Sequence, residues 1–565
     1  MLSDLDIAQQ AKMQPISEIA DKLGVQQDEL ESHGNYMAKI DLNILKRLED
    51  KPNGKFITVT AITPTPLGEG KTVTNLGLGM ALSKIGKKTC NVIREPSKGP
   101  TFGIKGGACG GGYSQVVPME NINLHFTGDI HAVDTAHNLL NAALDSHLAH
   151  GNKLNIDTNF ITINRCVDVS DRALRDIVIG LGGTANGYPR QAGYDITVAT
   201  ETAAIHSLTN SLKDLRQRLG RMVVGYTYDG KPVTAEDLKV AGAMTVLMKD
   251  AIKPNLVQTL ENTPAIVHGF PFANVAHGNN SVIANLAALK LADYVVTESG
   301  FGADCGAEKL IDVVCRQANL KLDCVVITLS IRALKMHGGA FELKPGQKLN
   351  RELVAKDNMP ALEKGCENLK VHIENMRSFG IPVVVTINKF TDDKPQETDF
   401  VKKYAVDNGA SFAVPIDPWA KGGEGCLEAA EAIVKACSMP NNFHFLYPDD
   451  LSIEEKIETI AKKIYRADGV DYSPQAKKRI KLYTKLGYSK LPINMAKTHL
   501  SISHDPNLKG APKDFRVPVR DIRASIGAGF LYPLLGQMRT MPGLPSRAAY
   551  MDVDIDSEGK TLGLF

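Results

Sequence analysis

The segment from Thr65 to Thr72 has the residue types and order of a loop that binds phosphate groups. It reads TPLGEGKT and stands between a β-branched run, KFITVTAIT, and a helical stretch, VTNLGLGMALSKIG. In that position the loop N–H groups and the N-terminus of the helix can converge on a polyphosphate. The sequence therefore predicts a nucleotide site made of Thr65, Pro66, Leu67, Gly68, Glu69, Gly70, Lys71 and Thr72.

Two side chains of this loop carry the expected chemistry. Lys71 would neutralise charge on the β- and γ-phosphates, and the Thr72 hydroxyl would bind Mg²⁺. Thr65 stands where the pattern G-x-x-x-x-G-K-[ST] has its first glycine, so one position departs from that pattern. The plain alternative is a glycine-rich turn that begins a helix and binds no ligand.

Two features downstream of the loop predict a second anion site. Arg94 follows a β-rich run, and its guanidinium could hold an anion with two hydrogen bonds, unless it forms a surface ion pair with Glu95 or another neighbour. The segment GIKGGACGGGY, residues 103–113, has six glycines in eleven residues, Gly106 and Gly107 among them. Glycine costs chain entropy and packs no side chain, so this density favours a backbone that cradles a ligand over a hinge or a tight crossover.

Apolar runs of strand length recur along the chain, with amphipathic helical segments between most of them. This alternation predicts a largely parallel sheet covered by helices on both faces. We expect residues 1–50 to be helical and the strands to lie in KFITVTAIT, KKTCNVI, NFITI, DITVAT, DYVVTES, CVVITLS and IPVVVTINKF.

The length of 565 residues exceeds what one compact core can serve. We predict a multidomain α/β protein with a P-loop NTPase-type, largely parallel sheet core and additional α/β domains. Residues 1–135 with about 298–370 would form the nucleotide-binding core, about 136–297 a second α/β domain, and about 371–565 a C-terminal domain.

Composition excludes several classes of protein. Hydrophobic residues make up 43% and charged residues 23%, as in ordinary globular proteins, and the net charge of +2 offers no general attraction to nucleic acid or anionic lipid. No apolar run approaches the roughly 18 residues of a membrane span, and the acidic start MLSDLDIAQQ is unlike a signal peptide. Nine scattered cysteines without a C-x-x-C pair form no disulfide framework or zinc ribbon. We expect a cytoplasmic protein that binds neither nucleic acid nor a membrane.

Longer motifs resemble one enzyme family, formate–tetrahydrofolate ligase, also called 10-formyltetrahydrofolate synthetase. The likeness runs from about residue 15 to the terminal GKTLGLF, and because no dehydrogenase–cyclohydrolase region precedes it, the chain resembles the monofunctional form. The motifs are TPLGEGKT, REPSKGPTFGIKGGACGGGYSQVVPMENINLHFTGDIHA, TPAIVHGFPFANVAHGNNSVIA, VVTESGFGADCGAEK and MPGLPSRAA.

The resemblance implies ATP-dependent joining of formate to N10 of tetrahydrofolate, which gives 10-formyltetrahydrofolate, ADP and phosphate. Formate is a poor electrophile, so its oxygen must first become a phosphate leaving group, and formyl phosphate is the expected intermediate. The family also implies a fold similar to dethiobiotin-synthetase-type P-loop enzymes, dependence on Mg²⁺ and on a monovalent cation, K⁺ or NH₄⁺, and a homotetramer.

The resemblance also implies roles for particular residues. For formyl phosphate these are Lys71, Arg94, Gly106, Gly107, His125, His131 and His268; for folate, with the C-terminal domain contributing, they are Phe301, Pro382 and Trp419. The alternatives are satisfied structural histidines and, for the apolar residues, core packing. His125 and His131 are six residues apart, which does not present both to one metal on a helix, so we expect no zinc.

Four positions depart from the family pattern. Cys109 replaces a usual Ala, Phe270 a Gly, Ala203 a Met and Met37 a Lys. We expect Phe270 to matter most, because its ring is large, it disfavours a positive φ and it lies two residues from His268.

Two other functions stay open from the sequence. A P-loop ligase for a different small carboxylate would turn over ATP with that acid in place of formate. A nucleotide-driven switch would hydrolyse ATP without formate and respond to a protein partner.

Overall fold

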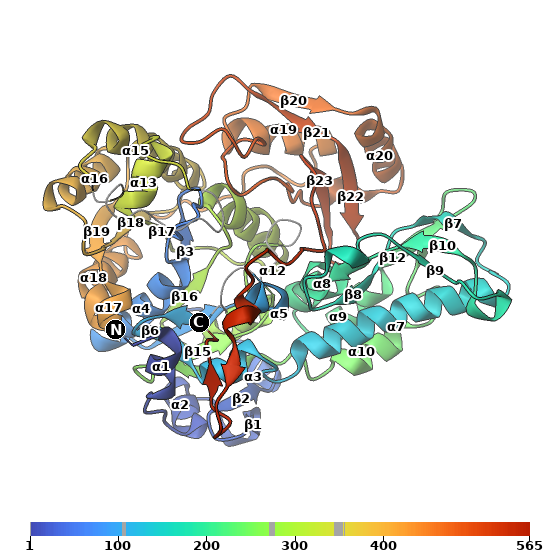
Figure 1. The fold of residues 1–565 in the computed structure, drawn as a ribbon, viewed down its shortest axis with the longest axis horizontal. Coiled ribbons are helices and arrows are strands. Elements are labelled where there is room, and N and C mark those ends of the chain that lie inside the picture. Colours follow the sequence, from blue (N-terminus) through green and yellow to red (C-terminus); the bar gives the residue numbers. More distant parts are fainter. Residues whose placement is uncertain (1, 104–108, 271–276, 344–353, 355, 565) are drawn as a thin grey trace.

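The computed structural model describes residues 2–103, 109–270, 277–343, 354 and 356–564. A central sheet surrounded by helices carries an elongated arm on one side and a C-terminal lobe next to the arm (Figure 1). Gly106 and Gly107, predicted to cradle a ligand, lie outside the described residues.

The central sheet is mostly parallel. Its strand order is β1-β2-β14-β15-β4-β16-β3-β17-β18-β19, and every pair from β15 to β19 is parallel, whereas the pairs among β1, β2, β14 and β15 are antiparallel. The bounds are β1 (Leu30–His33), β2 (Met37–Ile40), β14 (Asn255–Thr259), β15 (Pro264–Val267), β4 (Thr89–Ile93), β16 (Tyr294–Glu298), β3 (Lys55–Ala61), β17 (Cys324–Leu329), β18 (Val383–Asn388) and β19 (Phe412–Ile416). A short hairpin of β5 (Gly110–Gly111) and β6 (Ser114–Val117) joins at β14.

The parallel strands are apolar on both faces because helices cover both faces. Along β3, Ile57 and Val59 pack in the cluster that contains α18, whereas Phe56 packs in the cluster on the opposite face. One face is covered by α4 (Lys71–Lys84) and α18 (Leu427–Ala436), and the other by α11 (Val282–Leu291), α13 (Ile331–His337), α15 (Met359–Arg377) and α16 (Pro395–Asp407).

Two of the predicted strands lie in the arm and do not join the central sheet. NFITI and DITVAT form β7 and β11, which pair outside the central sheet, β7 with β12 and β11 with β8. Both contain partly exposed residues, unlike a strand covered on both faces. The arm consists of α7 (Asp129–Ala149), β7 (Ile156–Ile161), β8 (Arg165–Val167), β9 (Ile177–Ile179), β10 (Arg190–Ala192), β11 (Tyr194–Ile196), α8 (Glu201–Leu208), α9 (Leu212–Gly220), β12 (Val223–Thr227), β13 (Pro232–Thr234) and α10 (Ala241–Met248).

The prediction that residues 1–50 are helical is wrong in part. Helix α2 (Ile16–Leu23) ends at Gly24 in the left-handed conformation, and the β1–β2 hairpin follows it. This hairpin extends the sheet through β14, a pairing between distant segments that local periodicity does not reveal. The other helices here are α1 (Asp4–Gln9) and α3 (Asn43–Arg47), and further short helices are α5 (Lys98–Phe102), α6 (Met119–Asn123), α12 (Arg316–Ala318) and α17 (Pro418–Lys421).

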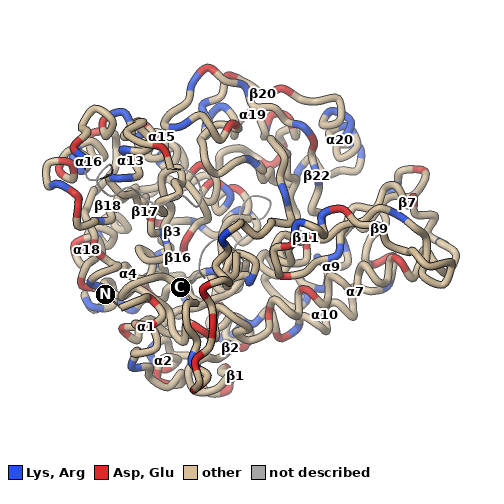
Figure 2. The backbone as a smooth tube through the Cα atoms, in the orientation of Figure 1, with Lys and Arg blue, Asp and Glu red and all other residues tan. Residues whose placement is uncertain are grey.

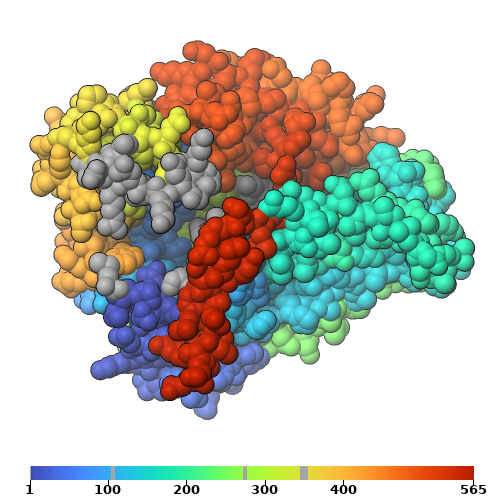
Figure 3. Space-filling model, viewed as in Figure 1, coloured from blue at the N-terminus to red at the C-terminus, as the bar shows by residue number. Residues whose placement is uncertain are grey.

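The C-terminal lobe and tail complete the molecule. The lobe consists of α19 (Ile453–Lys463), β20 (Gly469–Tyr472), α20 (Pro474–Lys485), β21 (Arg516–Val519), β22 (Asp521–Ser525) and β23 (Phe530–Leu534). The tail, with β24 (Asp554–Ile555) and β25 (Thr561–Leu562), lies across one face beside the arm and the N-terminal segment (Figure 3). Basic and acidic residues are interspersed along the described backbone (Figure 2). Within the described ranges, no helix combines the length and apolar character needed to cross a membrane.

The fold class is therefore mixed α/β with a large, mostly parallel central sheet. This sheet takes strands from all three segments of the predicted domain division, for example β3, β15 and β18. The domain boundaries stay a prediction.

Candidate active site

The predicted phosphate loop connects the end of β3 with the start of α4, at the carboxyl edge of the parallel sheet. Lys71 is the first residue of α4, and Gly70 caps the helix with φ 75°. A Cβ on Gly70 would lie 2.7 Å from the Asn388 side chain, so both conformation and space require glycine here. The helix N-terminus therefore opens at the end of the sheet where ligands of such folds bind.

Thr65 stands where the usual pattern has a glycine, and it closes the loop through hydrogen bonds with Glu69. The Glu69 carboxylate accepts hydrogen bonds from the Thr65 N–H at 2.6 Å and from its hydroxyl at 2.9 Å. Asn388, at the end of β18, donates its side-chain N–H to the Glu69 carbonyl at 2.6 Å. A side-chain bond thus shapes the loop in place of the first glycine.

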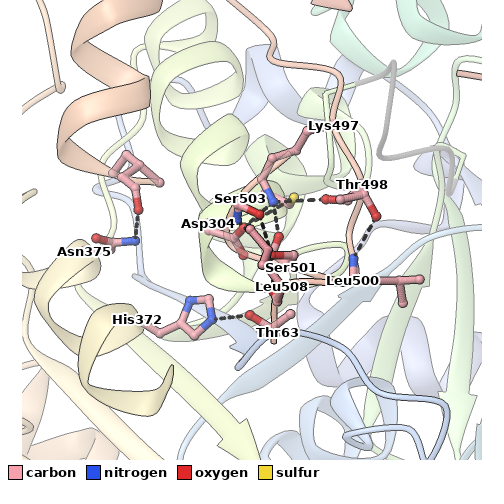
Figure 4. A network of polar contacts seen from close by, with 12 residues as sticks. Thr63, Asp304, His372, Asn375, Lys497, Thr498, Leu500, Ser501, Ser503 and Leu508 are labelled. Carbon is pink, nitrogen blue, oxygen red and sulfur yellow. Dashed lines mark hydrogen bonds and ion pairs between the residues drawn. The ribbon is translucent and has the colours of Figure 1, made fainter. Parts of the chain in front are cut away.

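Hydrogen bonds also hold the stem, the short segment between β3 and the loop. Thr63 bonds with Asn368 and His372 of α15, and His337 of α13 contacts the Thr63 carbonyl at 2.8 Å. Figure 4 shows the Thr63–His372 bond beside a buried network around Lys497. Asn368 also donates to the Gly510 carbonyl at 2.7 Å, which ties the C-terminal lobe to the phosphate-loop stem.

Glu298 is the central acidic residue of the site, and the sequence reasoning assigned it no role. It ends β16, is fully buried, and accepts a hydrogen bond from the Thr72 hydroxyl at 2.7 Å. Arg94 donates to the other carboxylate oxygen through Nε at 3.2 Å and Nη2 at 3.0 Å. The signal for Glu298 in the sequence is an acidic residue at the end of an apolar strand. In the structure, this strand lies next in the sheet to the strand before the loop.

This arrangement settles the geometry of Arg94. Its ion pair is formed with Glu298 across two neighbouring strands, and its side chain is only 12% exposed. Arg94 and Thr72 thus converge on one buried carboxylate beside the phosphate loop, which places a cation and a hydroxyl at the carboxyl edge of the sheet.

Two further buried carboxylates, those of Glu95 and Asp129, interact with each other near Arg94. Burial, and then the charge of Asp129, raise the pKa of Glu95 well above its usual value. Burial acts to raise the pKa of Asp129. The charge of Lys39, 2.7 Å away, is the largest of the charges that lower this pKa, and the net pKa lies below its usual value. Among the described atoms, the Glu95 Oε2 is buried without a hydrogen-bond partner.

The three predicted histidines lie in different environments. His125 and His131 are exposed, on the approach to α7 and in its first turn. His268 is fully buried, with Nδ1 2.6 Å from the Ser281 hydroxyl and Nε2 2.8 Å from the Ala251 carbonyl. Burial, and then His206, lower the pKa of His268 to about 3, so its ring stays neutral.

Asp129, His206 and His268 place one potential metal ligand each within 4.8 Å of one another. The Asp129 carboxylate already accepts hydrogen bonds from Lys39 and from Asn255, each at 2.7 Å. A divalent ion there would meet the buried Lys39 ammonium, so the donor set fits a hydrogen-bond network better than a metal centre.

Comparison with known proteins decides the family. The sequence profile described as formate–tetrahydrofolate ligase matches residues 2–565. The chain belongs to the formate–tetrahydrofolate ligase family. It is therefore an enzyme of the ligase class.

Relatives of this name are similar over their full lengths. The protein from Desulforamulus reducens is 61% identical over 563 residues, which cover 100% of this chain and 99% of the relative. Those from Roseiflexus sp. (strain RS-1) and Roseiflexus castenholzii are 56% and 55% identical over 564 residues, which cover 100% of each chain.

The three residues predicted to bind folate in this member of the formate–tetrahydrofolate ligase family do not all lie together. Phe301 follows β16 at a left-handed φ of 59°, and its ring stacks on His499 with centroids 4.3 Å apart. Trp419 lies on α17, 40% exposed, and its carbonyl accepts the Tyr113 N–H at 2.8 Å. Trp419 therefore adjoins the glycine-rich segment.

Pro382 does not join this region. It immediately precedes β18, and its carbonyl accepts the Val325 N–H at the start of β17. Pro382 is therefore buried at the amino edge of the parallel sheet, whereas Asn388 at the other end of the same strand reaches the phosphate loop. Pro382 thus lies at the opposite end of β18 from the phosphate loop, and its assignment to the folate site stays a prediction.

The Phe270 departure from the family pattern is accommodated by packing. Phe270 is 3% exposed and stacks on His206 of α8, with ring centroids 4.7 Å apart. Ala203 lies one turn earlier on the same helix, where a small residue leaves room on that face. Gly269 carries the positive φ of 79°, so Phe270 needs none.

The other two departures are also buried. The Cys109 thiol contacts the Asn123 amide oxygen at 3.4 Å, and burial raises the pKa of this thiol. Met37 packs with Cys109 in the small apolar cluster under the β5–β6 hairpin. Neither side chain is exposed for contact with a substrate.

Proposed function

We propose that this enzyme joins formate to N10 of tetrahydrofolate in an ATP-dependent reaction that gives 10-formyltetrahydrofolate, ADP and phosphate. Membership of the family supports the two substrates in its name. The observation that supports ATP is the loop from Thr65 to Thr72, with Arg94 and Thr72 converging on Glu298 beside it.

The reaction would proceed through formyl phosphate. A formate oxygen attacks the γ-phosphorus of ATP, the bond to the β–γ bridging oxygen breaks, and ADP leaves. The N10 lone pair then attacks the formyl carbon, the carbon–oxygen bond to phosphate breaks, and N10 loses its proton. Several negative charges meet in the first step, so Lys71 and Arg94 would act by stabilising them.

The residues present fit both proposed cations. Mg²⁺ prefers oxygen ligands, and the Thr72 hydroxyl with the Glu298 carboxylate would hold it, where it would neutralise phosphate charge. The buried oxygen of Glu95 that has no hydrogen-bond partner among the described atoms would hold the monovalent cation, K⁺ or NH₄⁺.

The histidines divide between two roles. His268 would support the site as a neutral, doubly hydrogen-bonded ring, since its lowered pKa leaves it a poor base at neutral pH. The exposed His125 and His131 would contact formyl phosphate or accept the N10 proton. Trp419 and Phe301 would supply flat faces for the pterin.

The experiment that tests the proposal measures ADP release by the purified protein with Mg²⁺ and ATP, while formate and tetrahydrofolate are omitted in turn. The folate product is followed by its absorbance after acid conversion. We expect turnover that needs both substrates. Equal ATP hydrolysis without them would support the nucleotide switch, and turnover with another acid would support a different carboxylate ligase.

Lys71→Ala is the first variant to compare. We expect it to lose formate-dependent ATP turnover while its circular dichroism and unfolding transition match the wild type. Wild-type activity in a folded Lys71→Ala protein would overturn the assignment of the phosphate loop. A homotetramer is the proposed assembly, which sedimentation equilibrium would test.

A further inference from the structure

The backbone of Phe301 is held in a conformation that phenylalanine rarely adopts. Its φ of 59° lies in the left-handed region, where a Cβ crowds the backbone. Both chain neighbours are fixed by hydrogen bonds. The Gly300 N–H donates to the Gly278 carbonyl at 2.8 Å, and the Gly302 carbonyl accepts the Cys305 N–H at 3.0 Å. The surroundings, and not local preference, therefore set the direction of the Phe301 side chain.

A histidine of the C-terminal lobe lies against this ring. His499 belongs to the segment between α20 and β21, and its ring stacks on Phe301 with an angle of 16° between the two planes and centroids 4.3 Å apart. Phe301 follows β16, the strand that ends at Glu298 beside the phosphate loop. The stack therefore joins the lobe to the carboxyl edge of the parallel sheet.

A buried ammonium group fixes the segment that carries the histidine. Lys497 Nζ donates to the carbonyl of Thr498 at 3.0 Å and to that of Ser501, which lie on either side of His499 in the chain. The same ammonium lies 2.7 Å from the carboxylate of Asp304, three residues after the phenylalanine (Figure 4). One side chain thus binds both turns, so the two rings are held against each other.

The stack differs from ordinary core packing. Phe301 and His499 are both only half-buried, whereas Phe56 and Phe379 in the core are 1% and 0% exposed. A flat ring against one face of Phe301 opposes rotation of its side chain, because any other orientation would lose the stacked contact. The part of the phenylalanine that stays exposed is therefore presented in one orientation.

We propose that His499 is a positioning residue for tetrahydrofolate, which acts by holding the Phe301 ring in the orientation that receives the pterin. A pterin is flat, so its contact with an aromatic side chain depends on the orientation of that ring. A ring that is already fixed loses less conformational freedom when the substrate binds, which strengthens binding. The inference rests on the proposed function for Phe301 as a folate contact.

The test separates positioning of the ring from a general effect on the fold. Steady-state kinetics of the full-length protein are measured with tetrahydrofolate and ATP varied in turn. We expect His499→Ala to raise the KM for tetrahydrofolate about fivefold, the size expected for loss of one ring–ring contact, and to leave kcat and the KM for ATP within about twofold. His499→Phe keeps a flat ring and should restore the KM for tetrahydrofolate.

His504→Ala is the matched control. His504 lies in the same segment of the lobe and also contacts an aromatic ring, that of Phe515, with centroids 6.1 Å apart. Phe515 immediately precedes β21 and so belongs to the lobe itself. His504→Ala should therefore leave the KM values for tetrahydrofolate and ATP unchanged.

A double variant gives the sharpest comparison. Because His499 acts through Phe301, His499→Ala should add nothing to the rise in the KM for tetrahydrofolate that Phe301→Ala causes by itself. Additive effects, an unchanged KM for tetrahydrofolate in His499→Ala, or a parallel rise in the KM for ATP would overturn the positioning role. A lower KM for tetrahydrofolate in His499→Ala would also overturn it, because His499 would then occupy the face that the pterin needs.

Failure of the proposed function would look different. A wild-type protein without tetrahydrofolate-dependent turnover, or a Phe301→Ala protein with an unchanged KM for tetrahydrofolate, would contradict that function and the positioning role with it.

Discussion

At the scale of single residues, Glu298 explains how Thr72 and Arg94 come together. Its carboxylate is fully buried and bound by both, so it is neutralised by Arg94 and oriented by Thr72. A buried carboxylate in this position is stable only as long as its partners remain. The active arrangement therefore depends on a buried carboxylate to which the sequence analysis assigned no role.

We expect Glu298→Gln to lose about 3 kcal/mol of unfolding free energy, because the variant removes the buried carboxylate that forms the ion pair with Arg94. Formate-dependent ADP release should fall strongly as well. Urea denaturation and steady-state kinetics measure the two effects. Glu236→Gln is the control, since the Glu236–Arg216 pair is solvent-exposed and should contribute less than about 1 kcal/mol. Equal stability of both variants would contradict the role of Glu298.

Phe270 has a structural role by the same reasoning. Phe270→Ala would leave a cavity against His206 and should cost about 3 kcal/mol of unfolding free energy. The KM values for formate and tetrahydrofolate should stay within about twofold of the wild type, since the ring is buried. A changed KM with unchanged stability would show that this ring contacts a substrate.

At the scale of elements, the phosphate loop obtains its shape from a threonine–glutamate bond. The Thr65 hydroxyl contributes one of the two hydrogen bonds that Thr65 donates to the Glu69 carboxylate. Thr65→Ala should raise the KM for ATP about fivefold, the equivalent of about 1 kcal/mol for one hydrogen bond, and Thr65→Ser should restore it. The KM for tetrahydrofolate is the internal reference, and a parallel rise in both would show a general disturbance of the fold.

At the scale of the whole molecule, buried polar contacts connect the lobe to the sheet. The Lys497 ammonium lies 2.7 Å from the Asp304 carboxylate, and both side chains are nearly inaccessible (Figure 4). Lys497→Met should destabilise the protein by about 3 kcal/mol, since it leaves Asp304 buried without its partner. Lys497→Met with Asp304→Leu should recover part of this loss in chemical denaturation. No recovery would indicate that the pair contributes through other contacts.

Glu201 forms a second connection, from the arm to the lobe. Its carboxylate accepts the Gly527 N–H at 2.7 Å, and burial raises the pKa of Glu201 to about 7. The folded protein then binds more protons than the unfolded chain between the unfolded pKa near 4.5 and about 7. The unfolding free energy should therefore fall as pH rises through this window. Glu201→Gln should flatten that dependence, and an unchanged slope would contradict the assignment.

The sequence by itself determined the family, the mixed α/β class and the strand–loop–helix that contains Lys71. These are local patterns: β-branched runs form buried strands, and glycines permit the left-handed turn at Gly70. Only the tertiary structure decided which distant residues meet. Glu298 reaches Thr72 and Arg94 because parallel strands align their carboxyl ends, whereas Pro382 lies at the opposite edge because it immediately precedes its strand. The β1–β2 hairpin, the stacking of Phe270 on His206 and the stacking of Phe301 on His499 likewise depend on contacts across the chain, which no local periodicity encodes.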